Sequence, residues 1–473
     1  TENNSTGDSS TISTKLGGLT LKSSTFSDNY AVGAATVSSI LAEIAIESCT
    51  FKDNVASSRI HHLYFKKLLN ELTISDSTFS NVILQSESST DITGNFLMIV
   101  DSSAIITGST FKRSHTERGA IVMDAEAETL TLQNCQFYDN YGSQAGAIYA
   151  KSSLIIESTV FQRGSNLIYT SGGKDVTIID STFKEHIEVA IYAEIVTRVA
   201  ITSSLFDEIP SHAIYSPYAN NNEQASGRLH CKYCGTVEVT STTFQNMIRQ
   251  TGCGAGIQID NPYIASEFTS IVGIYSSTFY NLLADIGGAL CFDGPDLNVL
   301  QITIKDTTIN HCKAYSKGGG VWFNSFKTTT PKGDYLSFSG ASKIKNCVSA
   351  KYGGAIYYES TRPTIEDTSS FFNDNSAGIY GPNWASYPVT LKIIKDPDES
   401  LWEDKVASRL LGEVREAVSR LTLRMLDDYS DTPPDFVSGQ IMDPPLVIGL
   451  VDEDGQVAKN WNDGEAQIVF SNS

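Results

Sequence analysis

One phrase recurs along this chain of 473 residues: apolar, variable, apolar, two variable positions, small, variable, phenylalanine. The first copy is LTLKSSTF, which ends at Phe26, and a later copy is VTIIDSTF, which ends at Phe183. About thirteen copies follow one another at a spacing of roughly 22 to 38 residues. A period in this range is typical of solenoids and propellers, so the repeat constrains the fold before any domains are counted.

The copies place ten phenylalanines at the same position of the repeat. They are Phe26, Phe51, Phe79, Phe111, Phe137, Phe161, Phe183, Phe206, Phe244 and Phe279. Further copies keep the spacing without the full phrase and reach Ile309, Ile344 and Phe371. If coils stack about 4.8 Å apart, like positions align into one aromatic column inside a tube. We therefore expect these phenylalanines to be core residues rather than binding residues.

Each copy also carries a second apolar element after its phenylalanine, such as AGAIYA at 145–150 and GGALCF at 287–292. Both elements alternate with period 2 and are separated by Gly, Asn, Asp or Ser, which indicates short strands joined by tight corners. Such strands cannot bury a face alone. They predict an all-β fold, a parallel β-helix of about thirteen coils. Propeller blades would need four strands within roughly 40 residues, and these repeats are too short.

Two paired motifs carry a resemblance to a known family. F-x-x-N begins at Phe26, Phe51 and Phe137, and G-G-A-[ILV] begins at Gly287 and Gly353. This pair resembles the repeats of the chlamydial polymorphic outer membrane proteins, and the pattern is similar to that of large ciliate surface proteins. The resemblance covers roughly residues 16 to 390. It implies a pectate-lyase-like, right-handed β-helix with an extracellular location and an adhesive or structural role at a cell surface.

The pattern divides the chain into segments. We expect a flexible N-terminal segment over residues 1–15 and the β-helix over residues 16–395. Apolar residues at spacings of three and four then follow a capping box of Ser400 and Glu403, which predicts an amphipathic capping or linker helix within residues 396–430. Its apolar face would cover the last coil, since solenoid ends need caps, and a partner-binding helix is the alternative.

The last segment, residues 431–473, alternates strand, Asp-Gly turn and strand, and it resembles the start of an Ig-like β module. The turn VDEDG lacks the ligand spacing of an EF-hand loop, so a solvated turn is favoured over a calcium site. We expect no cofactor. Because the sequence begins without Met and ends on a strand, we expect it to be part of a longer protein.

Charge narrows the classes of partner. Lys and Arg total 34 against 54 Asp and Glu, a formal net charge of -20. A surface this acidic repels phosphate backbones and anionic lipid headgroups, so nucleic acid is not expected as a partner. No apolar run approaches the roughly 20 residues that cross a bilayer, so we expect no membrane insertion within this segment.

Eight cysteines favour disulfides in an extracellular chain, because an even count permits complete pairing. Cys312 and Cys347 hold the same place on successive coils, and stacking would bring their Cα atoms to about 5 Å. We therefore predict a disulfide between them. Cys231 and Cys234 form CKYC, for which we expect a local disulfide rather than zinc, since a second C-x-x-C is missing.

Catalysis on a β-helix requires paired carboxylates, or calcium-binding acids with a basic residue, on one exposed strand face. The sequence has no N-T-D and no R-x-P-x-x-R, motifs carried by carbohydrate-active enzymes of this fold. We predict a non-catalytic structural or adhesive segment of an extracellular filament or coat, held by self-association, by sister proteins or by glycans. The alternative is a carbohydrate-active or carbohydrate-binding β-helix, which a row of exposed aromatics beside a carboxylate cluster would favour.

Overall fold

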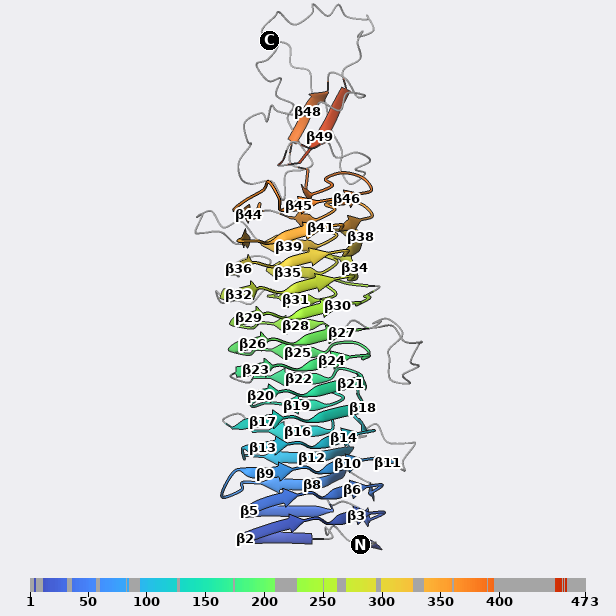
Figure 1. The fold of residues 1–473 in the computed structure, drawn as a ribbon, viewed down its shortest axis with the longest axis vertical. Helices are drawn as coiled ribbons and strands as arrows, with labels where there is room; N and C mark the ends of the chain where they lie inside the picture. The colour runs from blue at the N-terminus through green and yellow to red at the C-terminus, as the bar shows by residue number, and fades with distance from the viewer. Residues whose placement is uncertain are drawn as a thin grey trace, which may run out of the picture.

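The structure is a computed structural model. It describes residues 4–5, 12–31, 36–56, 60–81, 83–84, 94–125, 128–172, 175–208, 228–249, 251–261, 269–294, 299–325, 336–359, 361–388, 390–394, 447–452, 454 and 456. All regular elements in these ranges are strands, and they build a long rod (Figure 1). The rod is a parallel β-helix: each coil lays down strands that pair in parallel with those of the coils before and after it.

A typical coil has three walls that run the length of the rod. The first two walls join at the N-terminal end into one sheet, and the third wall is a separate sheet. The first wall contains β8 (Ile60–Lys66), β12 (Gly94–Val100), β16 (Ile121–Asp124), β19 (Ile148–Ala150), β22 (Ile168–Ser171), β25 (Ile191–Glu194), β28 (Leu229–Lys232), β31 (Ile257–Asp260), β35 (Leu290–Gly294), β39 (Val321–Ser325), β43 (Ile356–Tyr358) and β47 (Trp384–Ser386). The second wall contains β9 (Leu72–Ser75), β13 (Ala104–Thr107), β17 (Thr129–Gln133), β20 (Ser153–Glu157), β23 (Asp175–Ile179), β26 (Arg198–Thr202), β29 (Thr236–Thr240), β32 (Thr269–Tyr275), β36 (Val299–Lys305), β40 (Leu336–Ser339) and β44 (Thr364–Ile365). The long strands β2 (Ile12–Lys22) and β5 (Val37–Glu47) belong to both walls.

The third wall carries the repeated phenylalanine. It contains β3 (Thr25–Ser27), β6 (Thr50–Lys52), β10 (Thr78–Ser80), β14 (Thr110–Lys112), β18 (Gln136–Gly142), β21 (Val160–Gly164), β24 (Thr182–Lys184), β27 (Leu205–Asp207), β30 (Thr243–Gln245), β33 (Thr278–Tyr280), β37 (Thr308–Asn310), β41 (Lys343–Lys345) and β45 (Phe372–Asn373).

Short strands line the corner that follows the third wall. They are β1 (Asn4–Ser5), β4 (Tyr30–Ala31), β7 (Val55–Ala56) and β11 (Ile83–Leu84) in the N-terminal part, β15 (His115–Thr116), and β34 (Leu283–Ile286), β38 (Lys313–Lys317), β42 (Val348–Ser349) and β46 (Ser376–Ala377) in the C-terminal part.

The ten phenylalanines from Phe26 to Phe279 form one stack inside the tube. Neighbouring ring centroids lie 4.5 to 5.0 Å apart and the rings are nearly parallel. All ten side chains are buried, because each strand of the third wall points its phenylalanine at the axis. Ile309 and Ile344 continue the column, and their next partner is Phe372. The expected position, Phe371, is shifted by one residue: its ring is buried and packs edge-on against Phe338.

The sharp corner before the third wall has a local cause. The residue at that corner has a left-handed backbone, as at Ser158 and Asp180, which both have φ of 49°. Gly, Asn and Asp accept this conformation at the lowest cost, which explains why they recur there, and Ser also occupies the corner in several coils. The small residue that follows is also a hydrogen-bonding group: Ser181 Oγ donates to Ile179 O (2.8 Å) and accepts from Thr159 N (3.2 Å) on the preceding coil.

The ends of the rod differ from the expected boundaries. Strand β2 begins at Ile12, before the predicted start at residue 16, because it already pairs in register with β5. The predicted helix over 396–430 lies outside the described residues. Of the predicted Ig-like module, β49 (Val447–Val451) is described, and it pairs antiparallel with β48 (Thr390–Ile394), directly after the β-helix. The expected partner strand after the Asp-Gly turn also lies outside the described residues.

Candidate functional site

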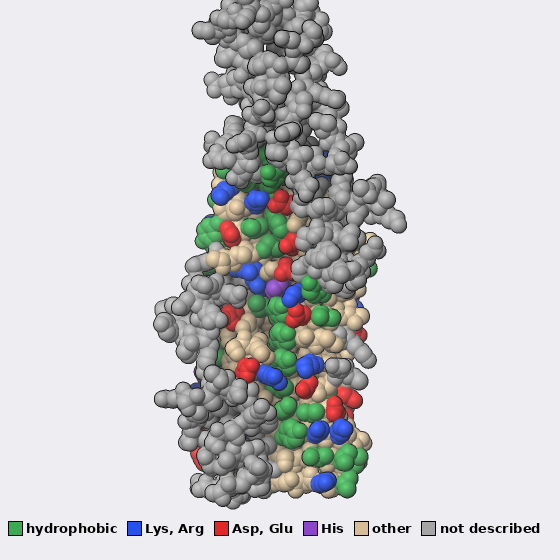
Figure 2. Space-filling view, turned by 180° about the vertical axis from the view of Figure 1, so that it is seen from behind, with side chains coloured by type: hydrophobic (Ala, Val, Ile, Leu, Met, Phe, Trp, Pro, Cys, Tyr) green, Lys and Arg blue, Asp and Glu red, His purple; other side chains and the backbone are tan. Residues whose placement is uncertain are grey.

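A row of aromatic side chains points outward from the first wall. Register pairing aligns Tyr149, Tyr169, Tyr192 and His230 on four successive strands, β19 to β28. The tyrosine ring centroids lie 5.2 and 5.3 Å apart, and His230 meets Tyr192 edge-on at 4.8 Å. Figure 2 shows a face of the rod on which hydrophobic side chains form a column with charged side chains beside it. We call Tyr149, Tyr169, Tyr192 and His230 the outer aromatic row.

The faces of these rings are covered by one another. Tyr149 and Tyr169 are parallel within 7°, and Tyr169 and Tyr192 within 6°. The guanidinium of Arg118 lies 5.5 Å from the centre of the Tyr149 ring, a cation–π contact. The half-buried tyrosines therefore present ring edges and hydroxyl groups to solvent, one hydroxyl per coil. Such a row suits hydrogen bonding to an extended ligand better than stacking of ligand rings.

A second outward row, two residues further along each strand, is charged. Pairing aligns Glu194, Lys232, Asp260 and Asp293 on β25, β28, β31 and β35. Lys232 Nζ donates to Glu194 Oε1 at 2.7 Å, and Tyr169 donates its hydroxyl to Glu194 Oε2 at 3.1 Å. The charged row is thus joined to the aromatic row. Because both rows stand on a continuous sheet, their spacing is fixed by the coil rise.

A hydrogen-bonded chain crosses the two rows at β28 and β31. His230 Nε2 lies 2.7 Å from Asp260 Oδ2, and Gln258 Nε2 donates to the same oxygen at 2.6 Å. Arg249 Nη1 donates to Gln258 Oε1 at 2.7 Å. With Asp260 ionised, the proton belongs on His230 Nε2, so the imidazole donates and the carboxylate accepts. This arrangement orients both side chains and leaves Asp260 a partly exposed acceptor.

The environment fixes the protonation state of each group. Lys232, hydrogen-bonded to Glu194, lowers the pKa of that carboxyl against the opposing effect of burial. Burial alone would raise the pKa of Asp260, but the hydrogen bonds from His230 and Gln258 and the charge of Arg228 lower it. Burial lowers the pKa of His230 despite its bond to Asp260. Burial also raises the pKa of Tyr169 to about 12.

These directions determine what the site can do chemically. A glycosidase needs a carboxylic acid held protonated, with a raised pKa, to protonate the leaving group. Glu194 and Asp260 have lowered pKa values instead, and the pKa of Lys232 is raised by Glu194, which keeps it a cation rather than a base. The cluster therefore supplies fixed donors and acceptors. Within the described ranges, no group of three His, Cys, Asp or Glu is arranged to hold a metal ion.

Towards the C-terminus the first wall is covered by its own chain. A disulfide joins Cys253 of the corner segment to Cys291, which occupies the aromatic-row position on β35, with Cα atoms 5.5 Å apart. Further along, Tyr357 of β43 is fully buried beneath Tyr352 and Tyr380. The outer aromatic row is thus accessible from β19 to β28. At the same register position further along, Cys291 and Tyr357 are buried, and Trp322 of β39 between them is half-buried.

The predicted cysteine pairs are not bonded in the structure. Cys231, Cys234, Cys312 and Cys347 are buried free thiols, whereas the bonded pair, Cys253–Cys291, was not foreseen. The prediction for Cys312 and Cys347 used the Cα distance alone. Side chains stacked in register keep their Cβ atoms about one coil rise apart, roughly 4.8 Å, whereas a disulfide needs about 3.5 to 4.5 Å. Cys253 and Cys291 lie on different elements that face each other, which removes this restriction.

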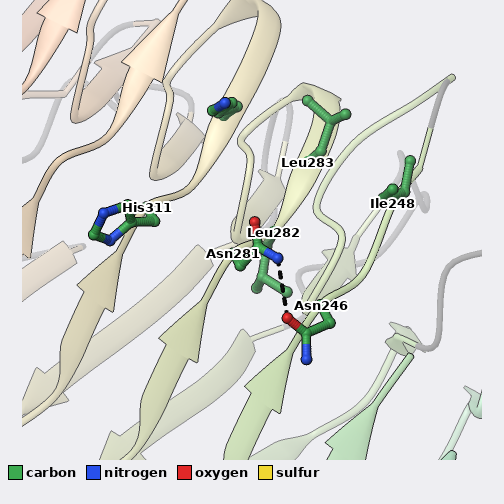
Figure 3. A pocket seen from close by; sticks show the side chains of 7 residues that line it. Asn246, Ile248, Asn281, Leu282, Leu283 and His311 are labelled. Carbon is green, nitrogen blue, oxygen red and sulfur yellow. Dashed lines mark hydrogen bonds between the residues drawn. The ribbon is translucent and has the colours of Figure 1, made fainter. Parts of the chain in front are cut away.

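A shallow hollow of about 310 Å³ lies beside the third wall near β34 (Figure 3). It is lined by Asn246, Ile248, Asn281, Leu282, Leu283, His311 and Lys313. Two of its amides bond to each other: Asn281 Nδ2 donates to Asn246 Oδ1 at 3.0 Å, as the dashed line shows. Both residues have positive φ, so they are corner residues. We assign the hollow a structural origin.

The sequence placed the core but not this site. The repeated phenylalanines are buried inside the tube, as expected of core residues. The outer aromatic row was visible in the copies AIYA, LIYT and AIYA, where tyrosine follows isoleucine three times in succession. The missing step was to assign that tyrosine to the outward side of the strand. No sequence signal foretold the contact between Arg249 and Gln258, because it joins a corner segment to strand β31.

Comparison with known proteins supports the fold. Residues 70–227 match the family model described as a right handed beta helix region. A solved structure, the catalytic unit of a thermostable GH87 alpha-1,3-glucanase from Streptomyces thermodiastaticus strain HF3-3, is 11% identical with a TM-score of 0.23. The alignment covers 76% of this chain and 63% of that chain, and at this TM-score it carries no functional argument. No curated protein matches the chain significantly. Within the described residues, no helix has the length and apolarity needed to span a bilayer.

Proposed function

We propose that this chain is a non-catalytic, extracellular adhesive rod that holds an extended neutral glycan along its first wall. The observation that carries the proposal is the pair of outward rows on one sheet: tyrosine hydroxyls on β19 to β25, and ionised carboxylates and an ammonium on β25 to β35. The two rows meet where Tyr169 donates its hydroxyl to Glu194 and Lys232 donates to the same carboxylate. Donors and acceptors that repeat once per coil suit a polymer of hydroxyl-rich units lying parallel to the rod axis. A pyranose unit has about the same length as one coil rise.

Charge selects the class of glycan. The accessible rows hold Glu194, Asp260 and Asp293 against Lys232, and the chain as a whole has a net charge of -20. A polyuronate would be repelled by this surface, so neutral or amino-bearing sugars are favoured over pectin-like polymers. The absence of catalysis is part of the proposal, since each carboxyl in the row with a shifted pKa is held ionised.

Contacts between copies would complete an architectural role. Strand β2 pairs with β5, and its other edge has no partner strand among the described residues. An unpaired strand edge is a template for another strand. We propose that copies of this chain or sister proteins associate through such edges in a surface coat or filament. Glycan binding along the wall remains available in that arrangement, because the edge and the wall face different directions.

The test is affinity measurement of the purified full chain against neutral, amino-bearing and uronic polysaccharides, with Tyr169→Phe and Glu194→Gln as variants. Tyr169→Phe keeps the ring stack and removes only the hydroxyl, so binding should weaken by about threefold to tenfold, the value of one hydrogen bond. Tyr275→Phe, the same change on the second wall, is the matched control and should leave affinity unchanged. The proposal would be contradicted if the polysaccharide were shortened during incubation, or if Tyr169→Phe bound it as tightly as the wild type.

A further inference from the structure

The turn after β49 reaches back to the last coil of the β-helix. Asp452 Oδ2 accepts a hydrogen bond from Ser386 N of β47 at 3.4 Å. Gln456 Nε2 donates to the carbonyl of Trp384 at 2.8 Å. Strands β48 and β49 stand beyond the last coil (Figure 1), so these contacts join the terminal strand pair to the rod. The turn thus covers part of the end that the sequence had assigned to a helix.

Two carboxyl groups are buried at this joint, and they have different partners. Asp454 accepts from the Tyr358 hydroxyl at 2.7 Å and pairs with the Arg362 guanidinium at 2.9 Å. Asp452 is 3% exposed and accepts from amide donors: Asp454 N at 3.0 Å, Gln456 N at 2.9 Å and Gln456 Nε2 at 3.2 Å. Among the described residues, no cation forms a salt bridge with Asp452.

The surroundings of Asp452 offer little compensation for a negative charge. From the last coils, the phenols of Tyr380 and Tyr387 and the carboxyl of Glu359 belong to the same electrostatic cluster. From its own turn comes Asp454, which pairs with Arg362 but whose pKa is also raised, because burial outweighs the hydrogen bond from Tyr358 and the charge of Arg362. Glu359 pairs with Lys317 at 3.2 Å and Asp454 pairs with Arg362 at 2.9 Å, so an ionised Asp452 would be a third carboxylate in this cluster, with no salt bridge of its own among the described residues. Burying such a charge without a cationic partner is costly. A carboxyl protonated on Oδ2 keeps the two shorter bonds, from Asp454 N and Gln456 N to Oδ1, and weakens only the two longer bonds to Oδ2.

We propose that this turn is a protonation-sensitive joint, which docks the terminal strand pair onto the last coil in acid and releases it as the pH rises. The proposal does not depend on the glycan-binding role. It concerns how the rod is oriented relative to whatever follows β49.

The direction of the pH effect on docking follows from the pKa of Asp452 in the docked and released states. Burial raises the pKa of Asp452 to about 7 in the docked state, against the opposing effect of the backbone donors. In the released turn the carboxyl is in water, with a pKa near 4. A group whose pKa is raised on docking favours docking below its free pKa, and that contribution is lost as the pH rises through the docked pKa. The docking constant should fall by about tenfold per pH unit between about pH 5 and pH 7.

The test is hydrogen–deuterium exchange of the full chain between pH 5 and pH 8, corrected for intrinsic exchange. Peptides that contain Ser386 and Gln456, whose amides donate to Asp452, should be protected at pH 5 and lose protection by pH 8. A peptide around Phe137 in the stacked core should stay protected throughout and serves as the internal control. Protection of the joint that does not change across this range overturns the proposal.

Two variants separate this carboxyl from other titrating groups. Asp452→Asn keeps an acceptor oxygen but cannot ionise, so the joint should stay protected at pH 8. Asp367→Asn removes an exposed acid near the same end and should exchange as the wild type does. If Asp452→Asn loses protection with the same pH profile as the wild type, another group drives the release and the proposal fails. If Asp452→Asn is unprotected at every pH, the acid-dependent protection of the wild type decides the question alone.

Discussion

Single side chains at the corner before the third wall form hydrogen bonds to the neighbouring coil. In most coils the residue two positions before the phenylalanine is Ser or Thr, and its hydroxyl accepts from an amide of the preceding coil: Ser181 Oγ accepts from Thr159 N, and Ser204 Oγ accepts from Ser181 N. A small side chain fits here because the phenylalanine of the same strand crowds the interior of the tube. Crowding accounts for size, but the hydroxyl also pairs a buried N–H that the corner would otherwise leave without a partner. Where Cys49 and Cys135 occupy the position, the thiol donates to nearby carbonyls instead.

Replacing Ser181 by alanine should destabilise the protein by about 1 to 3 kcal/mol, because the buried Thr159 N–H loses its acceptor. Ser181→Thr should have little effect, since threonine already fills the same place at Thr159, Thr242 and Thr307. Denaturant midpoints of the two variants provide the measurement. Equal midpoints for the alanine and threonine variants would show that the hydroxyl group does not contribute to stability at this position.

Removing one ring from the stack should cost more. Phe137→Ala opens a cavity between Phe111 and Phe161, whose ring centroids lie 4.9 and 4.8 Å from its own, and should lower stability by about 3 to 5 kcal/mol. Gln136→Ala changes the exposed neighbour on the same strand and is the matched control. If the thermal midpoint of Phe137→Ala were no lower than that of the control, the stacked rings would not contribute to stability as predicted.

At the scale of elements, corner segments tie neighbouring coils together beyond the backbone ladder. The Cys253–Cys291 disulfide links the corner after β30 to β35 on the next coil and encloses a separation of 38 residues. Arg249 in the same corner holds Gln258 of β31. The bond therefore fixes the corner beside the charged row, where the first wall changes from accessible to covered.

Peptide mapping of the unreduced protein should recover Cys253 linked to Cys291, with the other six cysteines as thiols that alkylate only after unfolding. Cys253→Ser should lower stability by about 2 to 4 kcal/mol through the freed loop. Cys347→Ser, a buried thiol without a bond, should not remove any disulfide peptide. Recovery of a Cys312–Cys347 peptide instead would restore the pairing that the sequence predicted.

The strands could be predicted from the sequence wherever the repeat is strict. Phe26 to Phe279 recur with a constant small residue two positions earlier, so register, parallel pairing and burial follow from one alignment. Prediction failed where the register drifts, as at Phe371 and Phe372 in the last coil. It also failed where two elements of unlike spacing meet, as at Cys253 and Cys291 or at Asp452 and Ser386. Such contacts depend on corner geometry, which the period of the repeat does not encode.

At the scale of the whole molecule, the core, the outward rows and the terminal joint lie in different parts of the rod. The interior is one continuous apolar cluster that runs from Leu21 to Phe371, so no coil has a separate core. The outward side of the first wall carries the aromatic and charged rows, and the end of the rod carries the joint at Asp452. Because these features lie on different faces, a change in one should leave the others intact.

The direction of the ladder also sets how the rod responds to load. Strands pair from coil to coil, so the hydrogen bonds between them point along the rod axis. A force that pulls the two ends of the rod apart therefore breaks these bonds one coil after another. Cys135 and Thr159 hold equivalent places on successive coils and are 24 residues apart. Under tension from both ends we expect stepwise extension in single-molecule traces, with about 80 Å gained for a coil of that length. A single cooperative rupture would contradict this, whereas sideways loading across the walls should meet far higher resistance.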